Sequence, residues 1–198
     1  MLDVGCGAGA ASLPLCPPAA KVVGVDGSAA MLAAFGERAA ASGVDHIEIE
    51  GHWPDVINKV APADVVVCNH VLYNIADLGP FVAALTFRAR HRTVIELTSE
   101  HPRAWMHPFW RAVHGIDRPT SPVADDAISV LVELRVKPNV ERWVLPTPMR
   151  GDTMEELTAF VRDALYVNED RDPEIVEVLR TNPPPLEREI TTLWWDAS

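Results

Sequence analysis

The chain opens on a short apolar strand that runs into a turn of closely spaced glycines. Residues 2–4 (Leu-Asp-Val) are followed by Gly5, Gly7 and Gly9. Glycine lets the backbone adopt positive φ and has no Cβ, so such a turn can bring backbone N–H groups against a bound molecule. The sequence therefore predicts a ligand-binding turn at the end of a first strand.

An acidic residue follows at the spacing that a nucleotide-binding fold requires. Residues 21–25 have the composition of a second strand, and Asp26 stands at its end. It lies about 20 residues beyond Gly5, the spacing at which a carboxylate accepts both hydroxyls of a ribose. The turn and Asp26 together indicate a Rossmann-like unit and a ligand that contains adenosine.

Two kinds of ligand fit this turn. Gly5, Gly7 and Ala10 also satisfy the dinucleotide fingerprint, in which the turn faces a pyrophosphate. Asp3 opposes that interpretation, because its carboxylate would repel a pyrophosphate and attract a cationic amine or sulfonium. A cationic ligand is therefore favoured, and an NAD(P) oxidoreductase is the weaker alternative.

The opening stretch L-D-V-G-C-G-A-G resembles motif I of the class I S-adenosylmethionine (SAM) dependent methyltransferases. The resemblance implies SAM as cofactor and S-adenosylhomocysteine (SAH) as its product, and our hypothesis for the methyl acceptor is a small molecule. It places Asp3 beside the methionine amino group and Asp26 on the ribose hydroxyls. The cofactor-binding residues that we expect are Asp3, Gly5, Gly7, Gly9, Asp26, Gly27, Met31, Trp53 and Asn69.

Three of these residues belong to later segments. Met31 lies in a helix expected over 29–42, where it contacts the adenosine or packs in the core. Trp53 follows the third expected strand, where it stacks on the adenine or closes the edge of the core, since an aromatic face suits a purine. Asn69 follows a strand expected over 64–68 and, by the resemblance, lies near the methionine part of SAM.

The rest of the chain alternates strands and helices. Consecutive βα units predict a doubly wound parallel sheet with right-handed crossovers. By the resemblance, the expected fold is an α/β, mostly parallel seven-stranded sheet with helices on both faces, an antiparallel last strand and a helical insert between the last two strands. After the first strand, strands are expected over 21–26, 44–50, 64–68, 92–97, 140–145 and 189–195, and helices over 8–15, 29–42, 55–60, 77–90, 125–137, 153–168 and 174–180.

The length of 198 residues fits one domain. We expect a single methyltransferase domain over 1–198, with a cofactor half at about 1–97 and a substrate-cap and C-terminal part at about 98–198. Residues 100–110, at the start of the second part, are rich in aromatic residues, proline and histidine. They suit a substrate cap, and a helix that packs two tryptophans on the sheet is the alternative.

Composition excludes several functions. The formal net charge is −11 with no run rich in Lys or Arg, so a nucleic-acid partner is not expected. The absence of a long apolar stretch and of a signal peptide predicts no membrane partner and a cytoplasmic location. Neither the three cysteines nor His101, His107 and His114 have metal-ligand spacing, so no metal is expected.

His70 is the candidate catalytic residue. Ligands of open α/β sheets bind outside the carboxyl ends of the strands, and His70 follows the strand at 64–68. Histidine titrates near neutrality and can act as a general base. Methyl transfer from a sulfonium is an in-line displacement that needs a base only for acceptors that do not ionise readily. The alternative is that His70 hydrogen-bonds the loop backbone.

The chain begins inside its first expected strand, whereas relatives of the family carry one or two helices before motif I. We therefore expect an upstream segment to be missing. Two hypotheses follow besides the NAD(P) enzyme: an active SAM-dependent methyltransferase, or a truncated and inactive SAM-binding or partner module of the same fold.

Overall fold

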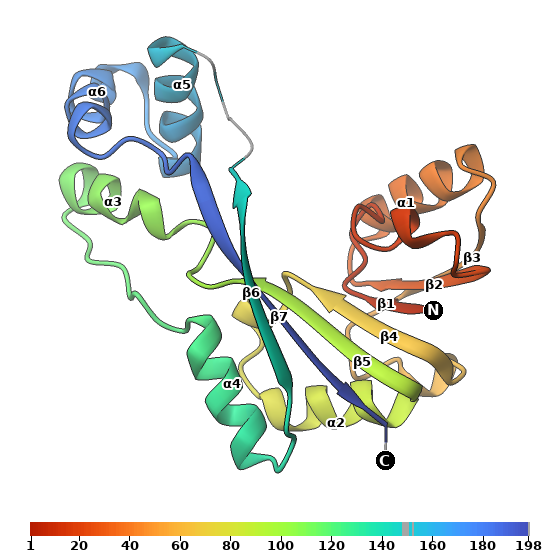
Figure 1. Cartoon of the computed structure of the whole chain (residues 1–198). Helices are drawn as coiled ribbons and strands as arrows, with labels where there is room; N and C mark the ends of the chain where they lie inside the picture. Colours follow the sequence, from red (N-terminus) through yellow and green to blue (C-terminus); the bar gives the residue numbers. More distant parts are fainter. Residues whose placement is uncertain (148–150, 152, 198) are drawn as a thin grey trace. The chain divides into compact units, whose positions relative to one another are not determined.

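The structure is a computed structural model that describes residues 1–147, 151 and 153–197 (Figure 1). These residues form two compact units, each with its own core. We call the first the sheet unit, Met1–Leu97, Asp125–Glu141 and Thr191–Ser198, and the second the helical unit, Thr98–Ala124 and Arg142–Ile190.

The described residues contain one seven-stranded sheet. Its spatial order is β3-β2-β1-β4-β5-β7-β6, which places β1 and β4 at the centre. The first five strands pair in parallel. The strands are β1 (Leu2–Val4), β2 (Lys21–Asp26), β3 (Asp45–Glu50), β4 (Ala63–Asn69), β5 (Ala89–Thr98), β6 (Asn139–Pro146) and β7 (Glu187–Asp196).

The last strand runs against its neighbours. The backbone N–H of Ala197 donates to the carbonyl of His91, and that of Ser99 donates to the carbonyl of Glu189. Residue numbers therefore increase along β5 in the direction in which they decrease along β7, so the two strands are antiparallel. The predicted doubly wound sheet with an antiparallel last strand is confirmed.

Two helices beside the sheet begin at side-chain caps. Ser28 accepts from the backbone of Met31 at 3.4 Å before α1 (Ala29–Ala41), and Asp77 caps α2 (Leu78–Arg88) in the same way. Figure 1 shows α1 beside β2 and β3. The apolar side of α1 packs with the turn and β2 in a core of Cys6, Leu13, Val22, Leu32, Phe35 and Ala39. Apart from its first residue, the helix α4 (Ala124–Glu133) also belongs to the sheet unit.

Two predicted α-helices are wrong. The segments 8–15 and 55–60 form only the 3₁₀ turns η1 (Leu13–Leu15) and η2 (Ile57–Lys59). In the first, Gly9 has a φ of +75° and breaks the helical conformation before it can start. The segment 55–60 forms a single short turn, and so few residues make too few hydrogen bonds to offset the free-energy cost of nucleating an α-helix.

The helical unit is built from α3 (His107–His114), α5 (Met154–Leu165) and α6 (Asp172–Thr181). The predicted insert between the last two strands is therefore present as α5 and α6, and Thr153 and Glu156 form the capping box that opens α5. This helix ends before the predicted Asn168, because Tyr166 takes the left-handed conformation with a φ of +57°. The core consists of Met106, Phe109, Val113, Val161, Leu165, Ile175 and Leu179.

Candidate functional site

The turn after β1 presents an open stretch of backbone. Gly5, Gly7 and Gly9 all have positive φ, between +51° and +75°. A Cβ on Gly5 would lie 2.3 Å from Val71 Cγ2, whereas one on Gly7 would have no described atom within 4 Å. Packing therefore requires glycine at position 5, and a ligand can approach the backbone at Gly7.

Asp26 ties the turn to the end of β2. One carboxylate oxygen, Oδ2, accepts from the backbone N–H of Gly7 at 2.9 Å, and Oδ1 accepts from that of Ser28 at 2.9 Å. A carboxylate has about four lone-pair sites, so each oxygen can accept one more hydrogen bond. The pair of oxygens is thus oriented and still able to hold two hydroxyl groups.

Two buried acceptors stand on neighbouring strands without a partner. Asp3 is 1% exposed and lies in register between Gly24 of β2 and Val67 of β4. Within the described part of the chain, Asp3 Oδ2 and Asn69 Oδ1 are buried and have no hydrogen-bond partner. Because buried polar atoms are nearly always paired, these two atoms are placed to accept hydrogen bonds from a bound ligand.

The surroundings of the turn are electrically negative. Burial raises the pKa of Asp3 from 3.8 to about 6; the Ser12 hydroxyl opposes this rise, although no well-formed hydrogen bond joins the two side chains, and the Asp26 carboxylate adds to it. Burial, followed by the charges of Asp3 and Asp26, raises the pKa of the Cys6 thiol to about 12. A cationic ligand is therefore attracted to this turn and a pyrophosphate is repelled.

The residues expected around the adenosine divide into two groups. Met31 is 49% exposed on the first turn of α1 and is accessible to a ligand. Trp53 is only 8% exposed, and its Nε1 donates to the carbonyl of Phe81 at 3.3 Å. This placement agrees with the alternative in which Trp53 closes the edge of the core, and its stacking on the adenine stays a prediction.

His52 takes the exposed place beside the turn that was predicted for Trp53. Its ring lies against Gly27, where an added Cβ would be 2.5 Å from His52 Cε1. The sequence analysis missed His52 in favour of the larger aromatic residue next to it. The available signal was its position, two residues after the end of β3.

His70 lies directly after β4 and faces a carboxylate on the next strand. Its backbone has a φ of +60°, and its N–H donates to the Glu96 carbonyl at 2.7 Å. The ring atom Nε2 is 3.6 Å from Glu96 Oε1, and both side chains are partly exposed. Glu96 pairs with Asn69 in the β4–β5 register. The sequence analysis missed Glu96, whose only signal was a lone carboxylate in an apolar strand.

Two further structural features bear on the function. Among the residues that the structure describes, no group of three or more His, Cys, Asp or Glu side chains is placed to hold a metal ion. No helix in the same residues is long and apolar enough to cross a membrane.

Comparisons with known proteins find a family model that matches nearly half of the chain. Residues 2–95 match the family model described as Methyltransferase domain, a span that includes all nine predicted cofactor residues. No curated protein matches the sequence. Residues 2–95 are therefore similar to a methyltransferase domain.

Several solved structures share the fold at low sequence identity. Magnesium protoporphyrin IX methyltransferase from Synechocystis, solved with SAH, is 16% identical with a TM-score of 0.57, over 97% of this chain and 72% of that one. The YcgJ protein from Bacillus subtilis is 16% identical with a TM-score of 0.60, over 98% and 88%. Precorrin-6y C5,15-methyltransferase from Geobacter metallireducens is 12% identical with a TM-score of 0.55, over 98% and 78%.

Proposed function

We propose that this chain binds SAM at the turn after β1 and transfers its methyl group to a small-molecule acceptor. The observation that carries the proposal is the pair of buried, unpartnered acceptors, Asp3 Oδ2 and Asn69 Oδ1. An ammonium group such as that of the methionine part of SAM supplies the missing donors and neutralises the Asp3 carboxylate.

The other predicted residues fit the remaining parts of the cofactor. Asp26 has the capacity for two ribose hydroxyls, and Gly7 leaves room for the ligand beside the backbone. Gly27, Met31 and His52 would border the adenosine. When bound, SAM supplies an electrophilic methyl group, and the chain's contribution is to align the acceptor with it and to exclude water.

The net charge of −11 supports a small molecule over a nucleic acid as acceptor. The two alternatives are an inactive SAM-binding module and an NAD(P) enzyme. The negative charge of Asp3 opposes the NAD(P) enzyme. A cytoplasmic location and the absence of a nucleic-acid or membrane partner stay predictions.

Calorimetry with SAM, SAH and NAD tests the proposal, and two glycine variants locate the site. Gly7→Ala and Gly43→Ala both place a Cβ at positive φ, +51° and +67°, with no described atom within 4 Å. Each is expected to destabilise the fold by about 1–2 kcal/mol. Only Gly7→Ala should weaken SAM binding, by about tenfold or more, because its methyl group occupies the ligand's space.

Three results of this experiment are informative. Binding of NAD in preference to SAM would reject the proposal, and equal SAM affinities of the two variants would place the cofactor elsewhere. SAM binding without SAH formation from any acceptor would favour the inactive module.

We further propose that His70 accepts the acceptor's proton. The carboxylate of Glu96, 3.6 Å from His70 Nε2, stabilises the protonated ring and orients it. With an acceptor that ionises readily, such as a thiol, the same residues are dispensable.

His70→Ala is expected to lower SAH formation about 100-fold for an alcohol probe such as benzyl alcohol, a typical contribution of general base catalysis. The rate with thiophenol, which is already ionised near neutral pH, should change little. SAH production by each variant is the measurement. His46→Gln is the matched control, because His46 Nε2 also lies 3.6 Å from a carboxylate, Glu48 Oε1, on the edge strand β3. Equal losses with both probes would show that His70 is structural.

A further inference from the structure

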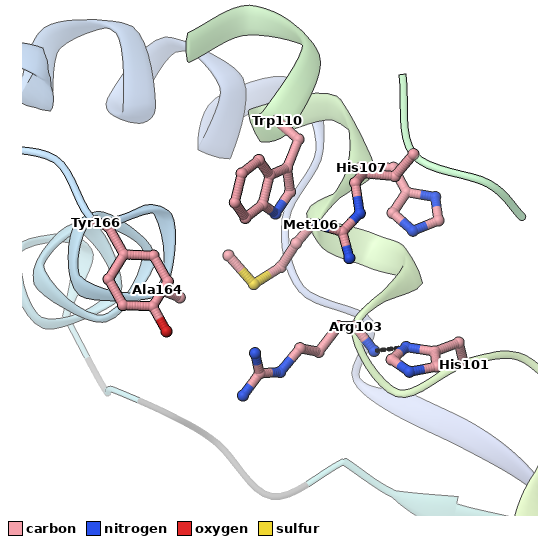
Figure 2. A pocket seen from close by; sticks show the side chains of 8 residues that line it. His101, Arg103, Met106, His107, Trp110, Ala164 and Tyr166 are labelled. Carbon is pink, nitrogen blue, oxygen red and sulfur yellow. Dashed lines mark hydrogen bonds between the residues drawn. The ribbon is translucent and has the colours of Figure 1, made fainter. Parts of the chain in front are cut away.

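The helical unit has a pocket of its own. A cavity of about 190 Å³ is lined by the segment that leads into α3, by α3 itself and by the end of α5. Figure 2 shows Arg103, Met106 and Trp110 on one side of this space and Tyr166 on the other. None of these residues belongs to the SAM site proposed above.

The polar lining of the pocket is cationic. Among the residues that the structure describes, His101, Arg103, His107 and Arg118 line it and no carboxylate does. In the described residues, neither arginine has an ion-pair partner, and the Arg118 guanidinium instead lies 4.9 Å from the centre of the Trp110 ring. Two arginines without an ion-pair partner are unusual in a chain with a net charge of −11, where carboxylates are abundant.

The positive charges act on one another. The pKa of His101 is lowered by burial and by the charges of Arg103, His107 and Arg118. Like charges held close together are unfavourable, so an anion that enters the pocket is stabilised by the guanidinium groups of Arg103 and Arg118.

The apolar lining and the volume limit the rest of the ligand. Met106 and the Trp110 ring form an apolar wall, and thioethers and indoles both make favourable contacts with aromatic rings. A cavity of about 150 Å³ holds a benzene molecule, whereas sites for drug-sized ligands are about 300–1,000 Å³. A pocket of about 190 Å³ therefore suits one ring with a small substituent.

We propose that this pocket binds a small aromatic carboxylate. The ring packs against Met106 and Trp110, and Arg103 and Arg118 hold the carboxylate through the paired N–H groups that guanidinium offers. An inorganic oxyanion alone would use the arginines but leave the apolar wall without a partner. The inference rests on the helical unit and is independent of SAM binding and of methyl transfer.

Calorimetry on the full chain with benzoate, benzamide and inorganic phosphate tests this. Benzoate is expected to bind, and uncharged benzamide of nearly the same shape to bind at least about tenfold more weakly. Arg103→Gln and Arg118→Gln should each weaken benzoate binding about tenfold or more. Arg111→Gln is the matched control, because Arg111 is an exposed arginine of α3 that pairs with Asp117 and does not line the pocket.

A second readout does not depend on the variants. Because a bound carboxylate offsets the surrounding positive charge, the NMR titration midpoint of His101 should rise when benzoate is present. Arg103, His107 and Arg118 are the charged groups that act on it. Both pocket arginines are exposed, so circular dichroism and the thermal unfolding midpoint should show that their variants remain folded.

Three outcomes would overturn the proposal. No benzoate binding at millimolar concentration by the folded native chain would remove it. Phosphate binding as tightly as benzoate would define a site for small oxyanions instead. An equal loss of benzoate affinity in Arg111→Gln would show a general effect of net charge.

Discussion

Replacing Asp26 by alanine is expected to reduce the affinity for SAM by about 100-fold or more. The carboxylate is oriented by two backbone N–H groups, of Gly7 and Ser28, and each oxygen can accept one ribose hydroxyl. A hydrogen bond to a charged group contributes about 1.5–3 kcal/mol, so two of them correspond to the expected loss even after water replaces part of it. Calorimetric titration with SAM is the measurement.

Two further variants separate binding from folding. Asp26→Asn keeps one oxygen acceptor and the shape of the side chain, so its affinity should lie between those of the native chain and Asp26→Ala. Asp64→Asn changes the net charge equally at an exposed residue near the start of β4 and should bind SAM normally. An affinity of Asp26→Ala within twofold of the native value would show that this carboxylate does not hold the ribose.

The second large effect concerns Asp3 and pH. Its pKa is 3.8 ordinarily and about 6 in the folded chain, so between these pH values the folded state binds more protons than the unfolded state. The stability that Asp3 contributes is therefore highest below about pH 4 and falls by about 3 kcal/mol as the pH rises beyond 6. The substitution Asp3→Asn removes this titration.

Urea unfolding of the native chain and Asp3→Asn, both without cofactor, measures the effect. The difference in the free energy of unfolding should move by about 2 kcal/mol in favour of Asp3→Asn between pH 4 and pH 7. Asp64→Asn corrects for the loss of an ordinary exposed carboxylate. A difference that does not vary with pH would contradict the raised pKa of Asp3.

The same titration should appear in cofactor binding. An ammonium group beside Asp3 favours the charged carboxylate. SAM affinity is therefore expected to increase as the pH rises through about 6 and to lose this dependence in Asp3→Asn. If the SAM affinity of the native chain stayed constant over this pH range, the cofactor would not lie beside Asp3.

Local sequence patterns predicted much of the fold. The glycine spacing located the turn, Asp26 marked the end of β2, and the β-branched run before Asn69 located β4. Each of these features depends on residues that are close together in the chain. Helix limits were less accurate, because a single residue with positive φ, Gly9 or Tyr166, decides where a helix can begin or end.

The contacts between distant residues could not be read in this way. The pairing of His70 with Glu96 follows from the β4–β5 register, which the two strand sequences do not specify. Trp53 is buried, and its indole N–H donates to the carbonyl of Phe81 on α2, 28 residues along the chain. This contact leaves His52 as the exposed ring beside Gly27.

The raised pKa of Cys6 has a consequence for the chemical integrity of the protein. A thiolate is a strong nucleophile, and Cys6 lies on the turn where we place a donor of electrophilic methyl groups. With a pKa of about 12, only about one thiol in 10⁵ is ionised at neutral pH. Burial, to which the charges of Asp3 and Asp26 add, would thus also suppress alkylation of Cys6 by a methylating cofactor bound at this turn.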